Sequence, residues 1–211
     1  MPATSSLAPA DPQGRAVRPP ATAVILAGGQ GRRLGGLDKG LLELAGRSMV
    51  WRIIERLAPQ TEHLMINANR HLDRYRDLGY PVIEDLIPGS AGPLAGFHAA
   101  LVHATTPLVV VVPCDTPSLP TGLVGALWST MHSENVHIVY ARDGQRAHPA
   151  VALLRVDLAR DLGEWLDGGG RKIDQWYARH PGAACRFDDP RAFININTPE
   201  DRDAFIDSGT Q

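Results

Sequence analysis

The sequence predicts an α/β protein in which a mostly parallel central sheet is flanked by helices. Three observations carry this prediction. Apolar segments of strand length alternate with longer amphipathic segments along the chain. The run PLVVVV at 107–112 is nearly all apolar and β-branched, which is typical of a parallel strand buried on both faces. A glycine-rich stretch directly follows the first apolar strand, at 23–26.

One domain accounts for residues 21–211, because no internal repeat or low-complexity segment interrupts them. Residues 1–20 are rich in Ala, Pro and Ser and lack apolar periodicity, so we expect a flexible N-terminal extension there. A transit peptide is the competing interpretation, which Asp11 and the prolines disfavour.

In the first half of the chain, helix-start signals separate the apolar strands. The expected strands are 23–26, 63–68 and 80–83, and the expected helices are 49–57, 72–78 and 93 to 102 or 103. Ser48 is a suitable N-cap for the first helix, and Pro93 fits the first turn of the third. The second and third strands run into polar residues, Asn67 and Asp85, at the end where ligands lie in open α/β sheets.

The second half of the chain continues the alternation. The expected strands are 107–112, 136–141, 151–155, 184–187 and 193–196, and the expected helices are 119–131, 157–166, 171–179 and one that starts near 198. Asp157 is expected to cap its helix, and Thr198 followed by proline is a typical helix start. Alternation within the last strand places Asn195 and Asn197 on one face.

Composition narrows the possible functions. The chain has 211 residues, 44% of them hydrophobic and 21% charged, and its formal net charge is −2. These values are ordinary for a globular protein and give no sign of nucleic-acid binding. No apolar run is long enough to span a membrane. Cys114 and Cys185 lie far apart and outside any C-x-x-C motif, which indicates a reduced, cytoplasmic protein.

The stretch 24–39, VILAGGQGRRLGGLDK, has the character of an anion-binding loop. Its glycines let the backbone turn sharply and bring successive N–H groups close to a ligand. Arg32, Arg33 and Lys39 add positive charge, which suits the oxygens of a phosphate chain. The glycines are Gly28, Gly29, Gly31, Gly35 and Gly36. A surface turn with scattered basic residues is the alternative, which the coincidence of strand, glycines and cations disfavours.

Two common phosphate-binding motifs do not fit this loop. A P-loop needs Gly-Lys followed by Ser or Thr, whereas Lys39 precedes Gly40 and no hydroxyl follows. The dinucleotide motif G-x-G-x-x-G fails because Leu34 occupies its last position when counted from Gly29. The sequence therefore indicates a phosphate-binding loop of another type.

Asp115 is the strongest single catalytic candidate, because it follows the most buried strand. An aspartate that only ends a turn or caps a helix is the alternative interpretation. A glycine loop, a lysine and such a carboxylate suit a nucleoside triphosphate with Mg²⁺, which prefers one or two carboxylates plus phosphate oxygens. We expect Lys39, Arg33 and Asp115 to be catalytic and Asp115 to bind the metal, with Asp85 a less certain carboxylate.

Covalent catalysis is not expected. Cys114 adjoins Asp115, whose charge disfavours a thiolate, and no G-x-S-x-G motif is present. We expect direct displacement at phosphorus by a nucleophile on a second substrate. If that nucleophile is a phosphate oxygen, it is already anionic and needs no general base.

Several motifs together resemble the molybdenum cofactor guanylyltransferases. They cover residues 22–206 in the family's order: LAGGQGRRLGGLDKGLLEL, NANR, VIED, GPLAG, PCDTP, HPAVALL and FININTPED. Leu34 stands where methionine is common, and residues 1–20 are not part of the family pattern. The resemblance implies a Rossmann-like nucleotidyltransferase fold and Mg²⁺. It also implies transfer of GMP from GTP to the terminal phosphate of the molybdenum-bound pterin, molybdopterin, with release of pyrophosphate.

The resemblance also implies two sets of binding residues. On the GTP side the matching positions are Leu26, Ala27, Gly28, Gly29, Lys39, Asn67, Asp85 and Asp115, the last also the metal ligand. On the molybdopterin side they are Gly92, Gly96, Arg171, Asn195 and Asn197. We expect a cytoplasmic monomer that binds neither nucleic acid nor membrane and makes transient contact with proteins that deliver or accept the cofactor.

Two other functions compete with guanylyl transfer. A related enzyme could transfer a cytidylyl group to the same cofactor or make a sugar nucleotide, but cytidylyl enzymes tend to carry Leu-Ala-Ala-Gly where this chain has Leu-Ala-Gly-Gly. A nucleotide-binding adaptor without chemistry would need no metal carboxylate, so the presence of both Lys39 and Asp115 disfavours it.

Overall fold

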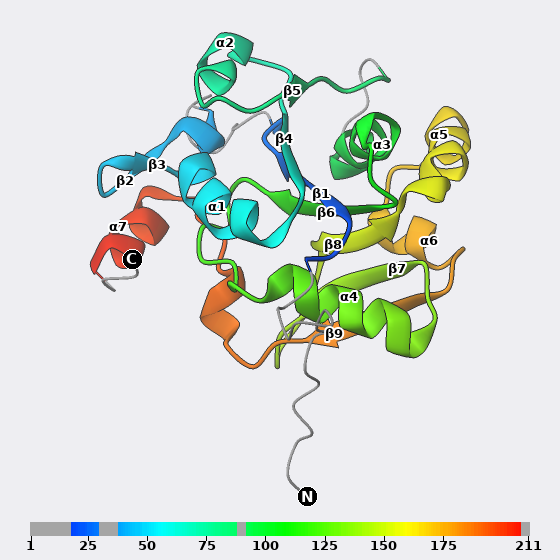
Figure 1. Ribbon diagram of the computed structural model, residues 1–211. Coiled ribbons are helices and arrows are strands. Elements are labelled where there is room, and N and C mark those ends of the chain that lie inside the picture. The colour runs from blue at the N-terminus through cyan, green and yellow to red at the C-terminus, as the bar shows by residue number, and fades with distance from the viewer. Residues whose placement is uncertain (1–17, 30–37, 88–91, 208–211) are drawn as a thin grey trace, which may run out of the picture.

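The computed structural model describes residues 18–29, 38–87 and 92–207, which form a sheet with helices on both faces (Figure 1). Residues 1–17 of the expected extension lie outside the described residues, as does the part of the glycine loop at 30–37, which includes Arg33. In the described part, the main sheet has the order β5-β4-β1-β6-β8-β7-β9. Its strands are β1 (Ala21–Leu26), β4 (His63–Asn67), β5 (Val82–Ile83), β6 (Leu108–Pro113), β7 (Ile138–Arg142), β8 (Ala147–Arg155) and β9 (Gly182–Arg186).

Most strand pairs of this sheet are parallel. Strands β5, β4, β1 and β6 run parallel to one another, and β7 pairs in parallel with β9. Strand β8 alone runs antiparallel to its neighbours, β6 and β7. The predicted α/β class with a mostly parallel sheet is therefore confirmed.

Helices cover both faces of the sheet and divide the core into two layers (Figure 1). One layer holds apolar side chains of α1, α2 and α4, and the other holds those of α3, α5 and α6. The helices are α1 (Met49–Leu57), α2 (Leu72–Arg76), α3 (Pro93–His103), α4 (Leu123–Glu134), α5 (Ala159–Asp167), α6 (Ile173–Tyr177) and α7 (Pro199–Asp207). Short 3₁₀ turns are η2 (Lys39–Leu41), η3 (Ala58–Gln60), η4 (Val156–Leu158) and η5 (Pro190–Phe193).

Strand β6 lies between the two core layers. Val110 and Val112 point into the layer of α1 and α4, whereas Val109 and Val111 point into the layer of α3 and α5. Successive side chains of a strand face opposite sides of the sheet. Since helices cover both sides, all four valines are fully buried. The unbroken run of β-branched residues is thus explained by burial on both faces.

The chain order places a topological switch point between β1 and β6. From β1 the chain moves outward to β4 and β5, and then returns to the other side of β1 to form β6. Leu26 at the end of β1 is level with Asn67 of β4 and Pro113 of β6. The carboxyl ends of these strands therefore lie at one edge of the sheet. Open α/β sheets bind their ligands outside this edge, at the switch point.

The strand predicted at 193–196 is wrong. Phe193 instead ends the 3₁₀ turn η5, and the residues that follow it are irregular. The alternation that suggested a strand is only partly real, since Ile196 is fully buried but Ile194 is 50% exposed. Proline at the start of η5 and a cap from the Asp189 carboxylate to Arg191 N–H favour a turn at this point.

Other predicted boundaries also differ from the structure, and the largest difference in a strand is at β8, which starts at Ala147 rather than at 151. The fourth helix begins at Leu123 rather than at 119, and the helix predicted at 171–179 is shortened to α6. Asp157 does not cap α5, because it lies inside the 3₁₀ turn η4 and its carboxylate binds the guanidinium of Arg155. The sequence analysis also missed a small hairpin, β2 (Glu43–Leu44) and β3 (Arg47–Ser48), whose two-residue turn has positive φ at both positions.

Among the described residues, no helix combines the length and apolar character that crossing a membrane requires.

Two helical glycines provide a matched test of how closely α3 packs on the ends of β1 and β4. A Cβ at Gly96 in α3 would lie 2.5 Å from Asn67 Oδ1 and 2.8 Å from Leu26 Cδ2, whereas one at Gly125 in α4 would meet nothing within 4 Å in the described structure. We predict that Gly96→Ala lowers the free energy of unfolding by about 1–3 kcal/mol through overpacking. Gly125→Ala should raise it by about 0.5–1 kcal/mol, because alanine favours helix. Urea unfolding measures both, and equal effects would contradict the packing of α3.

Candidate active site

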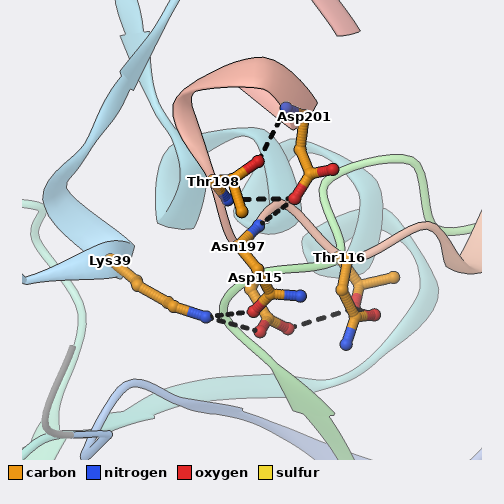
Figure 2. Close-up of polar contacts among 7 residues, drawn as sticks. Lys39, Asp115, Thr116, Asn197, Thr198 and Asp201 are labelled. Carbon is orange, nitrogen blue, oxygen red and sulfur yellow. Dashed lines mark hydrogen bonds and ion pairs between the residues drawn. The ribbon is translucent and has the colours of Figure 1, made fainter. Parts of the chain in front are cut away.

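Lys39 and Asp115 lie next to each other at the carboxyl edge of the sheet (Figure 2). Lys39 begins η2, and Asp115 follows β6 after a single intervening cysteine. The Lys39 ammonium lies 3.4 Å from Asp115 Oδ2 and also donates to Asn197 Oδ1. Both charged side chains are mostly buried, with 18% and 17% of their surfaces exposed. One cation therefore sits between oxygen acceptors from two distant parts of the chain.

Backbone and side-chain bonds fix the segment of Asn195 and Asn197 against the end of β6. The Ile196 N–H donates to the carbonyl oxygen of Asp115 at 2.9 Å. The Thr116 hydroxyl has two acceptors within reach of its one proton, Asn195 Oδ1 at 3.3 Å and Asp115 Oδ1 at 3.5 Å. Two amide oxygens, a hydroxyl and a carboxylate thus meet here, although the segment is not a strand.

The start of α7 holds Asn197 in place through a reciprocal cap (Figure 2). The Asp201 carboxylate accepts hydrogen bonds from the backbone N–H groups of Asn197 at 2.8 Å and Thr198 at 2.9 Å. The Thr198 hydroxyl in turn accepts from the Asp201 N–H at 3.1 Å. The N–H of Asn197 is the main cause that lowers the pKa of Asp201, and the nearby Lys39 ammonium adds to it. The predicted helix start is confirmed.

A second group of predicted residues gathers at the ends of β1, β4 and β5. The buried Asn67 side chain donates to Asp85 Oδ1 at 3.0 Å. Asn69 donates to the other carboxylate oxygen at 2.8 Å, and accepts from the Asp85 N–H at 2.9 Å. A Cβ at Gly28 would lie 2.8 Å from Asn69 Nδ2, so the start of the glycine loop packs directly on this group.

Arg171 lies on a third part of the structure, beyond the end of α5. Its guanidinium donates to the carbonyl oxygens of Leu166 and Gly170, each at 2.7 Å. Gly170 is pressed against the indole of Trp165, where a Cβ would overlap the ring. A surface pocket of about 510 Å³ opens at this loop, lined among others by Trp165, Arg171, Lys172 and Arg179.

The start of α3 adjoins the loop at 168–172, which contains Arg171. A Cβ at Gly92 would lie 3.9 Å from the Arg171 carbonyl oxygen, and its φ of +114° is one that favours glycine. Gly96, one turn further along α3, contacts Asn67 and Leu26 as described above. Helix α3 therefore connects the pocket at Arg171 with the ends of β1 and β4.

The structure thus divides the predicted site residues into three groups. Lys39, Asp115, Asn195 and Asn197 form the first; Leu26, Ala27, Gly28, Asn67, Asp85 and Gly96 form the second; Gly92 and Arg171 form the third. Gly29 accepts a hydrogen bond from Arg70, and Arg33 lies outside the described residues. Asn195 and Asn197, which the resemblance assigns with Arg171 to the molybdopterin side, lie beside Thr116 and Lys39.

Thr116, Asn69 and Asp201 are site neighbours that the sequence analysis did not single out as such. Each was adjacent to a recognised signal. Thr116 follows the candidate aspartate, and Asn69 lies in the polar stretch after its strand. The spacing Thr-x-x-Asp at 198–201 is that of a capping box, which predicts the reciprocal bonds of Asp201.

The chemistry of the first group suits a hard cation better than a covalent nucleophile. The described residues include no cluster of three or more His, Cys, Asp or Glu side chains that could hold a metal. A metal here would have Asp115 as its one carboxylate and amide oxygens of Asn195 and Asn197 nearby, a donor set that Mg²⁺ accepts when substrate oxygens complete it. Burial, reinforced by the Asp115 charge, raises the pKa of the Cys114 thiol, which supports the expectation that it is not a nucleophile.

The Rossmann-like sheet, the Lys39–Asp115 pair at its switch point and the matching family model together place the protein in the class of the nucleotidyltransferases. The chain belongs to the family of the MobA-like NTP transferase domain, whose model matches residues 23–183. The family resemblance drawn from the sequence motifs is therefore confirmed.

Named relatives and a solved structure agree with this assignment. A molybdenum cofactor guanylyltransferase of Shewanella woodyi is 49% identical over 181 residues, which make up 85% of this chain and 92% of that protein. One from Shewanella loihica is 45% identical over 185 residues, 87% of this chain and 94% of that protein. The crystal structure of molybdopterin-guanine dinucleotide biosynthesis protein A from Archaeoglobus fulgidus matches with a TM-score of 0.73 and 25% identity, covering 89% of this chain and 98% of that one.

The cap at α7 leads to a pH-dependent prediction. Because the pKa of Asp201 is lowered in the folded protein, its stabilising effect is present above the unfolded pKa of about 4 and is lost as pH falls through the lower folded value. We predict that Asp201→Ala costs about 1 kcal/mol of stability at pH 7. The difference from wild type should shrink below about pH 4 in urea unfolding. Asp203→Ala is the control, since Asp203 is exposed and paired only with its neighbour Arg202 in the described structure; an equal loss there would contradict the cap.

Proposed function

We propose that this protein transfers GMP from GTP to the terminal phosphate of molybdopterin, which forms the guanine dinucleotide form of the cofactor and releases pyrophosphate. The observation that carries the proposal is the contact of Lys39 with Asp115 and Asn197 at the switch point of the sheet. The relatives named molybdenum cofactor guanylyltransferases, at 45% and 49% identity, favour the guanylyl over the cytidylyl alternative.

GTP would bind across the carboxyl ends of β1, β4 and β6. The Ala27 N–H is already used by the carbonyl oxygen of Asn67, so the N–H groups of Gly28 and Gly29 are the proposed phosphate donors in the described part of the loop. The Asp85 carboxylate has four acceptor sites, of which the Asn67 and Asn69 amides use two. Its free sites suit guanine, whose ring N–H and amino group are donors on one edge.

The Lys39 ammonium would leave Asp115 for the phosphate oxygens of GTP. Asp115 is then released to bind a divalent cation, for which we propose Mg²⁺, with Asn197 close by. When bound, that ion would neutralise charge on the phosphates. Lys39 would stabilise the negative charge that develops on the departing pyrophosphate, in a mostly buried place where charge stabilisation is strong.

The reaction itself is a displacement at the α-phosphorus of GTP. An oxygen of the terminal phosphate of molybdopterin forms a new bond to this phosphorus, and the bond from the phosphorus to the bridging oxygen breaks. Pyrophosphate leaves with the electron pair. The attacking oxygen is anionic at neutral pH, so none of these residues has to remove a proton. The residues act by positioning and by electrostatic stabilisation.

The pocket beside Arg171 is the proposed site of the pterin. Its lining includes the indole of Trp165, over which the Arg179 guanidinium lies 5.3 Å from the ring centroid, together with the cationic side chains of Arg171 and Lys172 and the acidic Glu164. A flat heterocycle that carries a phosphate suits a pocket with three cationic side chains against one acidic one and an aromatic ring in its wall, provided that the heterocycle takes the place of Arg179 on that ring. Helix α3 would connect the pocket with the nucleotide, since Gly92 adjoins Arg171 and Gly96 adjoins Asn67.

Turnover with two nucleotides tests the proposed function. We predict that wild-type protein releases pyrophosphate from GTP, and much less from CTP, when the molybdenum-bound pterin is added. Asp115→Asn should lower turnover by roughly 10²–10³-fold, because a main electrostatic group is lost while the shape is kept. Asp203→Asn is the matched surface control and should behave as wild type. Faster use of CTP, or near-normal activity of Asp115→Asn, would contradict the proposal.

Arg171→Ala tests the assignment of the pterin site. Losing a charged hydrogen-bond donor should raise the KM for the pterin about tenfold or more. The Kd of GTP should stay within roughly a factor of two, since the Arg171 guanidinium bonds only to the carbonyl oxygens of Leu166 and Gly170 in the described structure. Arg186→Ala removes a guanidinium from an exposed ion pair and serves as the control. A larger effect on GTP than on the pterin would move Arg171 to the nucleotide side.

A further inference from the structure

Tyr75 contacts both chain neighbours of Lys39. Its hydroxyl donates to Asp38 Oδ1 at 2.5 Å. The same hydroxyl lies against the backbone of Gly40, where a Cβ would overlap it. Tyr75 is fully buried, and Asp38 and Gly40 are buried as well. The backbone on either side of Lys39 is therefore packed on one phenol from α2.

The Asp38 side chain binds Tyr75 and does not cap the 3₁₀ turn η2 that follows it. Asp38 occupies the N-cap position of η2, where an aspartate ordinarily accepts a hydrogen bond from the turn that follows. No such cap bond forms here. One carboxylate oxygen instead accepts from Tyr75, and the other lies 3.1 Å from Nδ1 of His71. Only 5% of the Asp38 side chain is exposed, so these contacts replace water for a buried carboxylate.

The segment that supplies Tyr75 also contacts Gly28 and Gly29, at the start of the glycine loop. Arg70 donates to the carbonyl oxygen of Gly29 at 3.1 Å, and Asn69 packs on Gly28. His71, the N-cap residue of α2, has a φ of +49°, which is uncommon for a residue other than glycine. With the chain in that conformation, Arg70 contacts Gly29 and the next residue, His71, contacts Asp38.

We propose that Tyr75, assisted by His71, is a positioning residue that acts through Asp38 and Gly40 to aim the Lys39 ammonium at the phosphate site. The inference rests on the proposed function, because Lys39 is the group that it serves. Burial and the Asp38 charge raise the pKa of Tyr75, so its hydroxyl keeps its proton and remains a donor. Without this bond, the buried Asp38 carboxylate would turn toward water and carry the first residue of η2 with it.

Tyr75→Phe tests the inference, since it keeps the ring and removes only the hydroxyl. We predict that kcat falls about 10- to 100-fold while the KM of the pterin is nearly unchanged, because a displaced catalytic group weakens the transition state. Tyr80→Phe is the matched control: Tyr80 packs on the same core layer, and its hydroxyl has no hydrogen-bond partner in the described structure. His71→Ala, at a 45% exposed side chain, should lower kcat less than Tyr75→Phe.

A crystal structure of Tyr75→Phe separates this inference from the proposed function. The inference predicts that Lys39 Nζ moves beyond the roughly 4 Å limit of an ion pair with Asp115. If wild-type protein shows no guanylyl transfer, the proposed function fails, and the Lys39 position still decides the inference. Wild-type kcat in Tyr75→Phe, or an unmoved Lys39, overturns the inference alone. A second variant, His71→Ala, reports on the same contact if Tyr75→Phe does not fold.

Discussion

The site depends on one shared cation, the Lys39 ammonium, which binds Asp115 and Asn197 together. These residues come from the first, middle and last parts of the chain, and each is held by a different structural device. Asp115 is set by the buried strand β6, Asn197 by the cap of α7, and Lys39 by the contacts of Asp38 and Gly40 with Tyr75. An error in any of the three would separate the lysine from its acceptors.

The Lys39–Asp115 ion pair is suited to being replaced by contacts with substrate and metal. The two side chains are mostly buried but about one-sixth of each surface stays exposed, so a substrate phosphate or a metal ion can reach the pair. A triphosphate offers Lys39 stronger acceptors than a single carboxylate does, and a divalent cation offers Asp115 a stronger partner than an ammonium. The contact therefore holds both groups in position while no substrate is present, and binding of nucleotide and metal would replace one ion pair by two better ones.

Much of this arrangement could be predicted from the sequence, because strong local signals coincide with burial. The valine run predicts β6 and so places Asp115 at a strand end, and the glycine stretch after a strand predicts a phosphate loop that ends at Lys39. The strand predicted at 193–196 was wrong because alternating side chains indicate which residues share a face. They do not show whether a neighbouring strand is there to pair with. Residue spacing cannot show tertiary contacts, which is why Tyr75 at Asp38 and Trp165 at Gly170 could only be found in the structure.

The most direct measurement is a crystal structure of the protein with a non-hydrolysable GTP analogue and Mn²⁺, whose anomalous signal locates the metal. The account predicts Mn²⁺ on an Asp115 carboxylate oxygen at a distance of roughly 2.0–2.2 Å, with the triphosphate at the carboxyl ends of β1 and β6 and Lys39 Nζ on a phosphate oxygen. A metal bound away from Asp115, or a triphosphate that Lys39 does not touch, would contradict it.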